Sequence, residues 1–220
     1  MSKTSRLMTV LASLLLAAAL ALPTWRINLI APQYPEGLGM QIHLGAIDGV
    51  GQYDLQNINE LNHYIGMRAI QQSDMPELRY MPWVVAALAA AGLAVAARGR
   101  RAPLLAWAAV LVAAGAAGMA DFWWRTYSYG HRLDVEHAVI KIPGMAYQPP
   151  IIGTKQILNF TASAWPAAGG VAILVAFVLG ATAVWLSIQN ARGQAVGDVE
   201  IRTYALRSQA GSRGDTGRAA

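Results

Sequence analysis

The stretch that decides the fold is residues 81–120, which read MPWVVAALAAAGLAVAARGRRAPLLAWAAVLVAAGAAGMA. Two apolar runs, 81–97 and 102–120, flank a short turn that is rich in arginine. As a helix, each run is about long enough to cross roughly 30 Å of hydrocarbon. The stretch therefore predicts two transmembrane helices joined by a tight, positively charged turn.

Two further apolar blocks, 7–25 and 165–187, have a similar length. Hydrophobic residues make up 55% of the chain and charged residues 13%, and the apolar residues gather in blocks, as they do in chains that span membranes. We therefore expect an all-α membrane protein with four transmembrane helices. The first block also fits a secretory signal peptide that ends at residues 19–21, so cleavage there is an alternative.

The basic residues predict an orientation for these four helices. Lysine and arginine are concentrated before the first block, in the turn at 98–101 and after the last block. The positive-inside rule places these three regions in the cytoplasm, so both termini are inside (N-in/C-in) and two long segments face outward. We expect a bacterial cytoplasmic membrane, with the outer segments in the periplasm or exterior. The net charge of +5 then reflects topology, and we expect no nucleic-acid partner.

This orientation divides the chain into six parts. They are a first transmembrane helix (1–25), an extracytoplasmic segment (26–80), a transmembrane hairpin (81–120), a second extracytoplasmic segment (121–164), a last transmembrane helix (165–188) and a disordered cytoplasmic tail (189–220). The tail is polar and rich in Gly, Arg and Ser, a composition that favours disorder. The two outer segments are expected to mix short strands, helix and loop.

The outer segments hold all the histidines of the chain: His43, His63, His131 and His137. In the first segment we predict a short strand at 41–44 and a helix at 57–72. The apolar stripe of that helix, at positions 58, 61, 65 and 69, leaves His63 and Met67 on its opposite face, one turn apart. A histidine and a methionine at this spacing are either packing residues or a metal-binding pair.

The residue types in the outer segments favour one metal over others. The chain has no cysteine, which excludes disulfides, iron–sulfur clusters and cysteine-based zinc sites. It also lacks a nucleotide-binding glycine loop and the common hydrolase motifs, so we expect no enzyme activity. Imidazole and thioether groups together suit Cu(I), whereas a calcium site needs several carboxylates from one loop.

Four strings in the outer segments carry a resemblance. They are 34–40 (YPEGLGM), 61–67 (LNHYIGM), 129–131 (YGH) and 142–150 (IPGMAYQPP). They resemble a family of four-span membrane proteins that are often encoded beside the maturation genes of nitrous oxide reductase, including its copper-chaperone lipoprotein. The resemblance implies copper handling, and it points to these residues as metal ligands: Met40, His63, Met67, His131 and Met145. His43 and His137 lie outside the matching strings.

The sequence thus leads to three hypotheses about function. The first is a copper-binding or copper-relay protein, without enzyme activity, that holds Cu(I) and helps to assemble an extracytoplasmic copper enzyme such as nitrous oxide reductase. Its partners would be the lipid bilayer and a copper chaperone or copper enzyme on the outer side. The second is a scaffold that docks a partner through its aromatic outer loops, with His and Met as packing residues. A subunit of a copper oxidoreductase ranks third.

Overall fold

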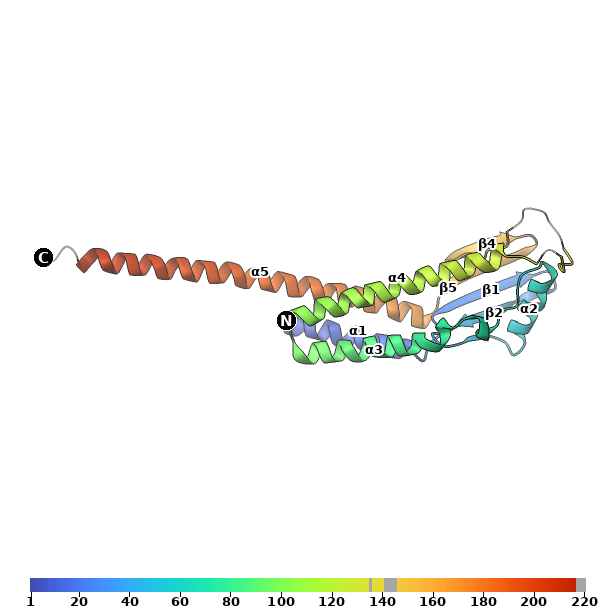
Figure 1. The fold of residues 1–220 in the computed structure, drawn as a ribbon, viewed down its shortest axis with the longest axis horizontal. Coiled ribbons are helices and arrows are strands. Elements are labelled where there is room, and N and C mark those ends of the chain that lie inside the picture. The colour runs from blue at the N-terminus through green and yellow to red at the C-terminus, as the bar shows by residue number, and fades with distance from the viewer. Residues whose placement is uncertain (135, 141–145, 217–220) are drawn as a thin grey trace.

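The computed structural model describes residues 1–134, 136–140 and 146–216. The helices are α1 (Lys3–Ala19), α2 (Asp54–Tyr64), α3 (Glu77–Arg98), α4 (Arg101–His131) and α5 (Ala168–Thr216), with one 3-10 turn at Gln72–Asp74. The strands are β1 (Trp25–Ala31), β2 (Tyr34–Ile42), β3 (Ile47–Gly49), β4 (Gly153–Ile157) and β5 (Phe160–Pro166). Helices α1, α3 and α4 and the first part of α5 lie side by side as a bundle, and the sheet with α2 sits at one end of it (Figure 1).

Three helices in the described part of the chain are long and apolar enough to cross a membrane: Glu77–Arg98, Arg101–His131 and the first part of α5, Ala168–Ala191. Large apolar side chains are exposed on their outer surfaces, among them Val112 at 59% and Val178 at 65%. Such a surface is unfavourable in water and suits the acyl chains of a bilayer. The length and apolar surface of these three helices are therefore consistent with a membrane protein.

The prediction of an all-α protein with four spans is wrong, and the first predicted span shows part of the reason. Helix α1 has 17 residues and ends at Ala19, and Pro23 precedes the start of β1 at Trp25. Because proline lacks the backbone N–H that a helix interior needs, the apolar run does not continue as one helix to Trp25. Its last residues instead turn into the sheet.

Helix α1 packs along α3 and α5 through small hydroxyl side chains. Ser5, Thr9 and Ser13 are completely buried, and each donates a hydrogen bond to a backbone carbonyl. The Ser5 hydroxyl reaches across to the Ala183 carbonyl of α5 at 2.9 Å. Small residues on this face let the helix backbones approach closely, as they commonly do in membrane bundles.

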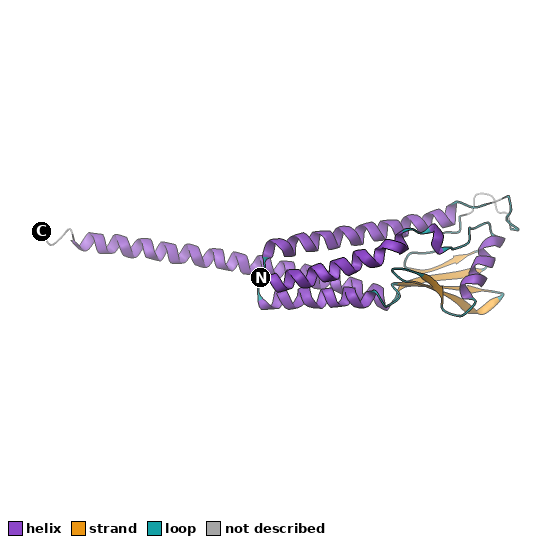
Figure 2. Ribbon diagram, turned by 60° about the horizontal axis from the view of Figure 1, so that its bottom comes forward, coloured by secondary structure: helices purple, strands orange, loops and turns teal. Residues whose placement is uncertain are grey.

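The outer segments form one antiparallel sheet with the strand order β3-β2-β1-β5-β4 (Figure 2). The central strand β1 pairs with β2 through a tight hairpin and with β5 on its other side. The strand predicted at 41–44 covers only the end of β2, because Pro35, Gly37 and Gly39 gave the earlier part a turn-like composition. These five strands are the second reason why the all-α prediction is wrong.

Exposed aromatic side chains mark the boundary between bundle and sheet. Trp83 on α3, Trp123 and Trp124 on α4, and Trp165 just before α5 are 47–75% exposed. Amphipathic rings of this kind favour the headgroup layer of a bilayer. We call these four residues the tryptophan belt. Helix α4, with 31 residues or about 46 Å, continues past the belt and runs alongside the sheet (Figure 1).

Helix α5 continues far beyond the bundle, to Thr216 (Figure 1). The sequence predicts a disordered tail from residue 189 onward, whereas in the structure this segment is helical to residue 216. Its sequence contains no proline and many good helix formers, such as alanine, glutamine and arginine.

Candidate functional site

A cavity of about 500 Å³ runs from within the bundle to the underside of the sheet. Every α-helix and every strand described above contributes at least one residue to its wall. The volume is within the range of small-molecule sites, roughly 300 to 1,000 Å³. It is the candidate functional site because it lies where all elements of the fold meet.

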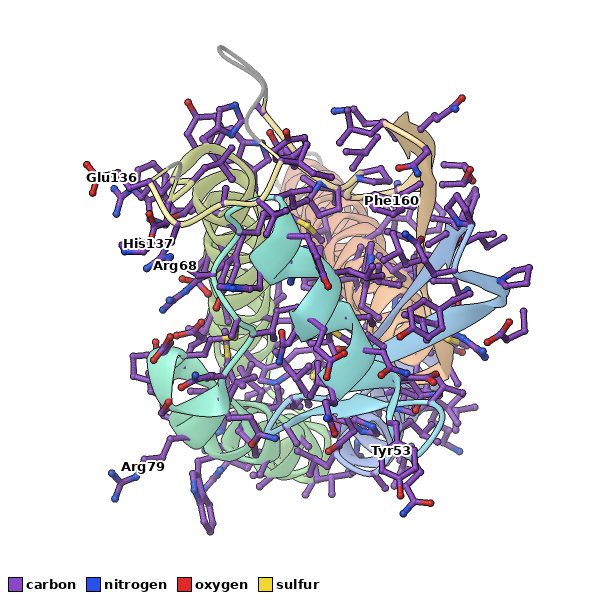
Figure 3. The ribbon with its side chains drawn as sticks, turned by 90° about the vertical axis from the view of Figure 1, so that its right-hand side faces the viewer. Tyr53, Arg68, Arg79, Glu136, His137 and Phe160 are labelled. Atoms are coloured by element: carbon purple, nitrogen blue, oxygen red, sulfur yellow. The ribbon has the colours of Figure 1, made fainter. Side chains whose placement is uncertain are left out.

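The outer half of the cavity is walled by the sheet and by α2. One face of the sheet supplies Met40 from β2 and Phe160 and Ala162 from β5, all of them buried. Helix α2 lies across this end of the molecule and supplies Ile58 and Leu61 (Figure 3). These two residues belong to the apolar stripe that the sequence predicted, and both are less than 9% exposed. The stripe therefore faces the cavity.

The inner half of the cavity lies among the membrane helices. Leu88 of α3, Leu111 of α4 and Phe177 of α5 form its wall. Gly115 of α4 faces the Phe177 ring so closely that any side chain at this position would clash with it. The small residue thus keeps α4 near α5 while leaving open space beside them.

Charged groups lie at the level of the tryptophan belt, on the wall of the cavity. The Arg125 guanidinium of α4 forms an ion pair with Glu77 at 2.7 Å between Nη2 and Oε2, and Nη1 donates to the Asp74 carbonyl at 2.8 Å. The Glu77 side chain is only 10% exposed. Asp121, one helical turn earlier on α4, lies farther away, with 4.0 Å between its Oδ1 and Arg125 Nε. The arginine therefore mainly fastens the start of α3 to α4.

Three residues on the cavity wall are also exposed on the outside of the bundle. They are Val84 of α3, Met119 of α4 and Leu174 of α5, at 37%, 45% and 53% exposure. Each lies on the membrane side of the tryptophan belt in its own helix. Single side chains therefore separate the cavity from the outer surface at a depth where acyl chains lie.

Of the five predicted metal ligands, the structure describes four, and it places these four in different surroundings. Met40 and Met67 line the cavity, whereas His63 and His131 are exposed on the surface. Helix α2 ends at Tyr64 and Gly66 adopts a positive φ of 75°, so His63 and Met67 are not one helical turn apart. The prediction of a helix to residue 72 is wrong here, because a glycine in the left-handed region stops it. Met145 lies outside the described residues.

The surface histidines have other neighbours. The His131 ring stacks on Tyr127 with centroids 3.9 Å apart, and its Nδ1 lies 2.9 Å from the Tyr127 carbonyl oxygen. His63 borders a shallow surface hollow beside α2 together with Val139. In the described ranges, no three His, Asp or Glu side chains come close enough to hold a metal ion.

The two histidines outside the matching strings behave differently from each other. His43 lines the cavity, which the sequence gave no reason to expect. His137 pairs with Asp134 at 2.9 Å on the surface. The hydrogen bonds from the His137 ring and backbone keep the pKa of the Asp134 carboxyl below its usual value.

The two outer segments pack against each other, as the idea of a shared site requires. The Asp134 backbone N–H donates to the Gly66 carbonyl at 2.8 Å, and the Ile140 N–H donates to the Tyr64 carbonyl at 2.9 Å. Arg68 donates to the Ser128 hydroxyl of α4 at 3.3 Å. Figure 3 shows Arg68 and His137 at the same edge of the molecule. These hydrogen bonds tie the second outer segment and the end of α4 to the loop that follows α2.

Comparisons with protein-family models and with curated proteins found no match to this chain. Nothing in these comparisons indicates an enzyme activity.

Proposed function

We propose that this protein binds a membrane lipid by its apolar chain, in the cavity that joins the bundle to the sheet. The single observation that carries the proposal is the continuity of that cavity across the tryptophan belt. Its inner half, at Leu88 and Phe177, lies at the depth of acyl chains, and its outer half, at Met40 and Phe160, lies beneath the sheet. A lipid that fills both halves, with its head at the level of the belt, is lifted partly out of the bilayer.

The chemistry of the wall supports an apolar chain. Most of the wall residues have aliphatic, aromatic or methionine side chains. An apolar cavity gives water few partners and gains free energy when an apolar ligand fills it. The exposed wall residues Val84, Met119 and Leu174 offer a path from the surrounding lipid. The occupant therefore comes from the membrane and does not need to cross water.

Photo-cross-linking tests this proposal. The full-length protein is reconstituted in vesicles that contain a lipid with a photoreactive diazirine at the end of one acyl chain. We expect adducts on peptides of β2 and β5, at or beside Met40 and Phe160. Adducts confined to outward-facing residues of the membrane helices would show that the chain stays in the bilayer and would overturn the proposal.

We further propose that the sheet lies outside the cytoplasm of a bacterial cell, with the helices in its cytoplasmic membrane. The opposite end of the bundle is basic, because the first residues of α1 meet the turn between α3 and α4 there. The Arg6 guanidinium donates to the Ala96 carbonyl at 2.8 Å, and the N-terminal amine donates to the Gly99 carbonyl at 3.1 Å. This gathers Lys3 and Arg6 with the arginines of the turn, and such clusters favour the cytoplasmic side.

The absence of cysteine makes this orientation easy to test. Gln52, near the sheet, and Arg100, in the turn between α3 and α4, are both exposed. The test uses cells with a permeabilised outer membrane and an intact cytoplasmic membrane. In these cells, a membrane-impermeant maleimide should label Gln52→Cys and should not label Arg100→Cys. After the membrane is opened, both should react. The reverse pattern would place the sheet inside.

Copper handling is a second candidate function, and one observation favours it. Five methionines and one histidine lie on the wall of the same cavity: Met40, Met67, Met75, Met81, Met119 and His43. Thioether and imidazole groups are ligands that suit Cu(I). A copper chaperone or a copper enzyme on the same side of the membrane would then be the partner. In this form the proposal rests on Met40, Met67 and His43 more than on the surface histidines.

Cu(I) affinity distinguishes these ligand sets. Replacing Met40 or Met67 by leucine keeps nearly the same side-chain volume and removes the sulfur. We expect weaker Cu(I) binding in both variants and in His43→Ala, measured by competition with a Cu(I) chelator on protein freed of lipid. His63→Ala and His131→Ala serve as controls and should bind as the wild type does. If no variant differs from wild type, these side chains are packing residues.

A further inference from the structure

The cavity wall also carries information about the lipid head, if the proposed function holds. We propose that the bound lipid is uncharged and that its head carries only hydroxyl or carbonyl oxygens, as diacylglycerols and isoprenoid quinones do. The head would lie against Arg125, Glu77 and Asp121. Arg125 and Asp121 lie within one helical turn of Trp123 and Trp124, so this cluster is at headgroup level.

The charge of the wall disfavours an anionic head. Among the described residues, the charged side chains that line the cavity are Glu77, Asp121 and Arg125, which gives two negative charges against one positive. The net charge is therefore −1. A phosphate brought into this partly buried site would be repelled by the excess carboxylate, and burial strengthens that repulsion.

The one positive group is already neutralised. Arg125 Nη2 lies 2.7 Å from the Glu77 carboxylate, and Nη1 donates to the Asp74 carbonyl. Sites that select phosphate usually offer an arginine fork that is free to bind two oxygens. Here both terminal nitrogens have partners within the protein, so the arginine does not offer such a fork.

The cluster can nevertheless bind neutral oxygens. Arg125 Nε has no hydrogen-bond partner, since the nearest Asp121 oxygen is 4.0 Å away. The Asp121 side chain is 41% exposed, and the 4.0 Å contact with Arg125 is its only interaction among those described. Its carboxylate can therefore accept a hydrogen bond from a hydroxyl group. The Tyr129 phenol also lies on the wall. A hydroxyl or carbonyl head would use these groups without bringing in a charge.

The test compares three photoreactive lipids that share the same acyl chains. They are a diacylglycerol, a phosphatidylglycerol and a phosphatidylethanolamine, each presented to the full-length protein in vesicles of one uncharged carrier composition. We expect the diacylglycerol to give about ten times more adducts on β2 and β5 than the phosphatidylglycerol, which corresponds to about 1.4 kcal/mol. Equal or greater labelling by either phospholipid would overturn the inference about the head.

A pair of charge-reversal variants links this preference to the wall. Asp121→Lys changes the net charge of the wall from −1 to +1, and it should reduce or reverse the preference for diacylglycerol over phosphatidylglycerol. Glu36→Lys makes the same change at an exposed position on β2 that does not line the cavity, and it should keep the wild-type preference. Equal effects of the two variants would contradict the assignment of the head to this cluster.

The outcomes separate this inference from the proposed function. If none of the three lipids labels β2 or β5, no chain enters the outer half of the cavity, and the proposed function fails together with the inference. If all three label these strands equally, the proposed function stands and only the uncharged head is overturned.

Discussion

Replacing Ala114 by phenylalanine should reduce chain-end labelling of β2 and β5 by at least about tenfold. Ala114 lies on α4 beside Gly115 and lines the inner half of the cavity. A phenyl ring added there occupies space that the chain needs on its way from the membrane helices to the sheet. Filling empty volume in the cavity costs less than overpacking a dense core, where an extra group costs about 1–3 kcal/mol. The variant should therefore still fold.

Ala113→Phe is the matched control. Ala113 is the preceding residue of α4, is exposed and does not line the cavity, so its phenyl group would enter the surrounding lipid. Labelling of the sheet should equal that of the wild type. Thermal denaturation of both variants in detergent checks that they are folded. Wild-type labelling of a folded Ala114→Phe variant would mean that the chain does not pass this point.

The membrane helices were the most predictable part of the fold. The two runs at 81–97 and 102–120 lie within α3 and α4. A long apolar segment is expected to be helical, because in a bilayer its backbone N–H and C=O groups must bond to one another. The apolar stripe of α2 was also predictable, since Ile58, Leu61 and Ile65 repeat at helical spacing and all three are buried. Local patterns sufficed in both cases.

The sheet could not be predicted from local patterns. Its central pairing joins β1 to β5, and Ile30 lies opposite Thr161, 131 positions further along the chain. Strand β2 contains Pro35 and two glycines, which are unfavourable within a strand in isolation. Its hydrogen bonds to β1 outweigh that composition. Tertiary pairing with β1 therefore outweighed the low local strand propensity of β2.

The site was only partly predictable, for a related reason. The spacing of His63 and Met67 suggested a metal pair, but it assumed that the helix continued through Gly66. The methionines were singled out as possible ligands, whereas the feature that unites Met40 and Met67 in the structure is a cavity between elements far apart in sequence. A cavity has no sequence motif. The ion pair between Glu77 and Arg125 joins α3 to α4, and no local sequence pattern predicts it.

Loss of this ion pair should have the largest effect on stability. Arg125→Met leaves the Glu77 carboxylate, 10% exposed, without its cation and also removes the donor to the Asp74 carbonyl. An uncompensated buried charge typically costs 3–5 kcal/mol, and because the arginine is 30% exposed we expect about 3 kcal/mol. The midpoint of thermal denaturation in detergent should fall accordingly.

Two further variants show whether the loss comes from the stranded charge. Glu77→Gln combined with Arg125→Met removes both charges together, so the midpoint should recover much of the loss seen in Arg125→Met alone. Arg79→Met removes an arginine two residues after Glu77 on α3, and Figure 3 shows Arg79 pointing away from the protein. It should leave the midpoint unchanged, because an exposed arginine contributes little to stability. If Arg125→Met denatures at the same temperature as Arg79→Met, the pair does not fasten α3 to α4, and the belt-level wall of the cavity is held by apolar packing alone.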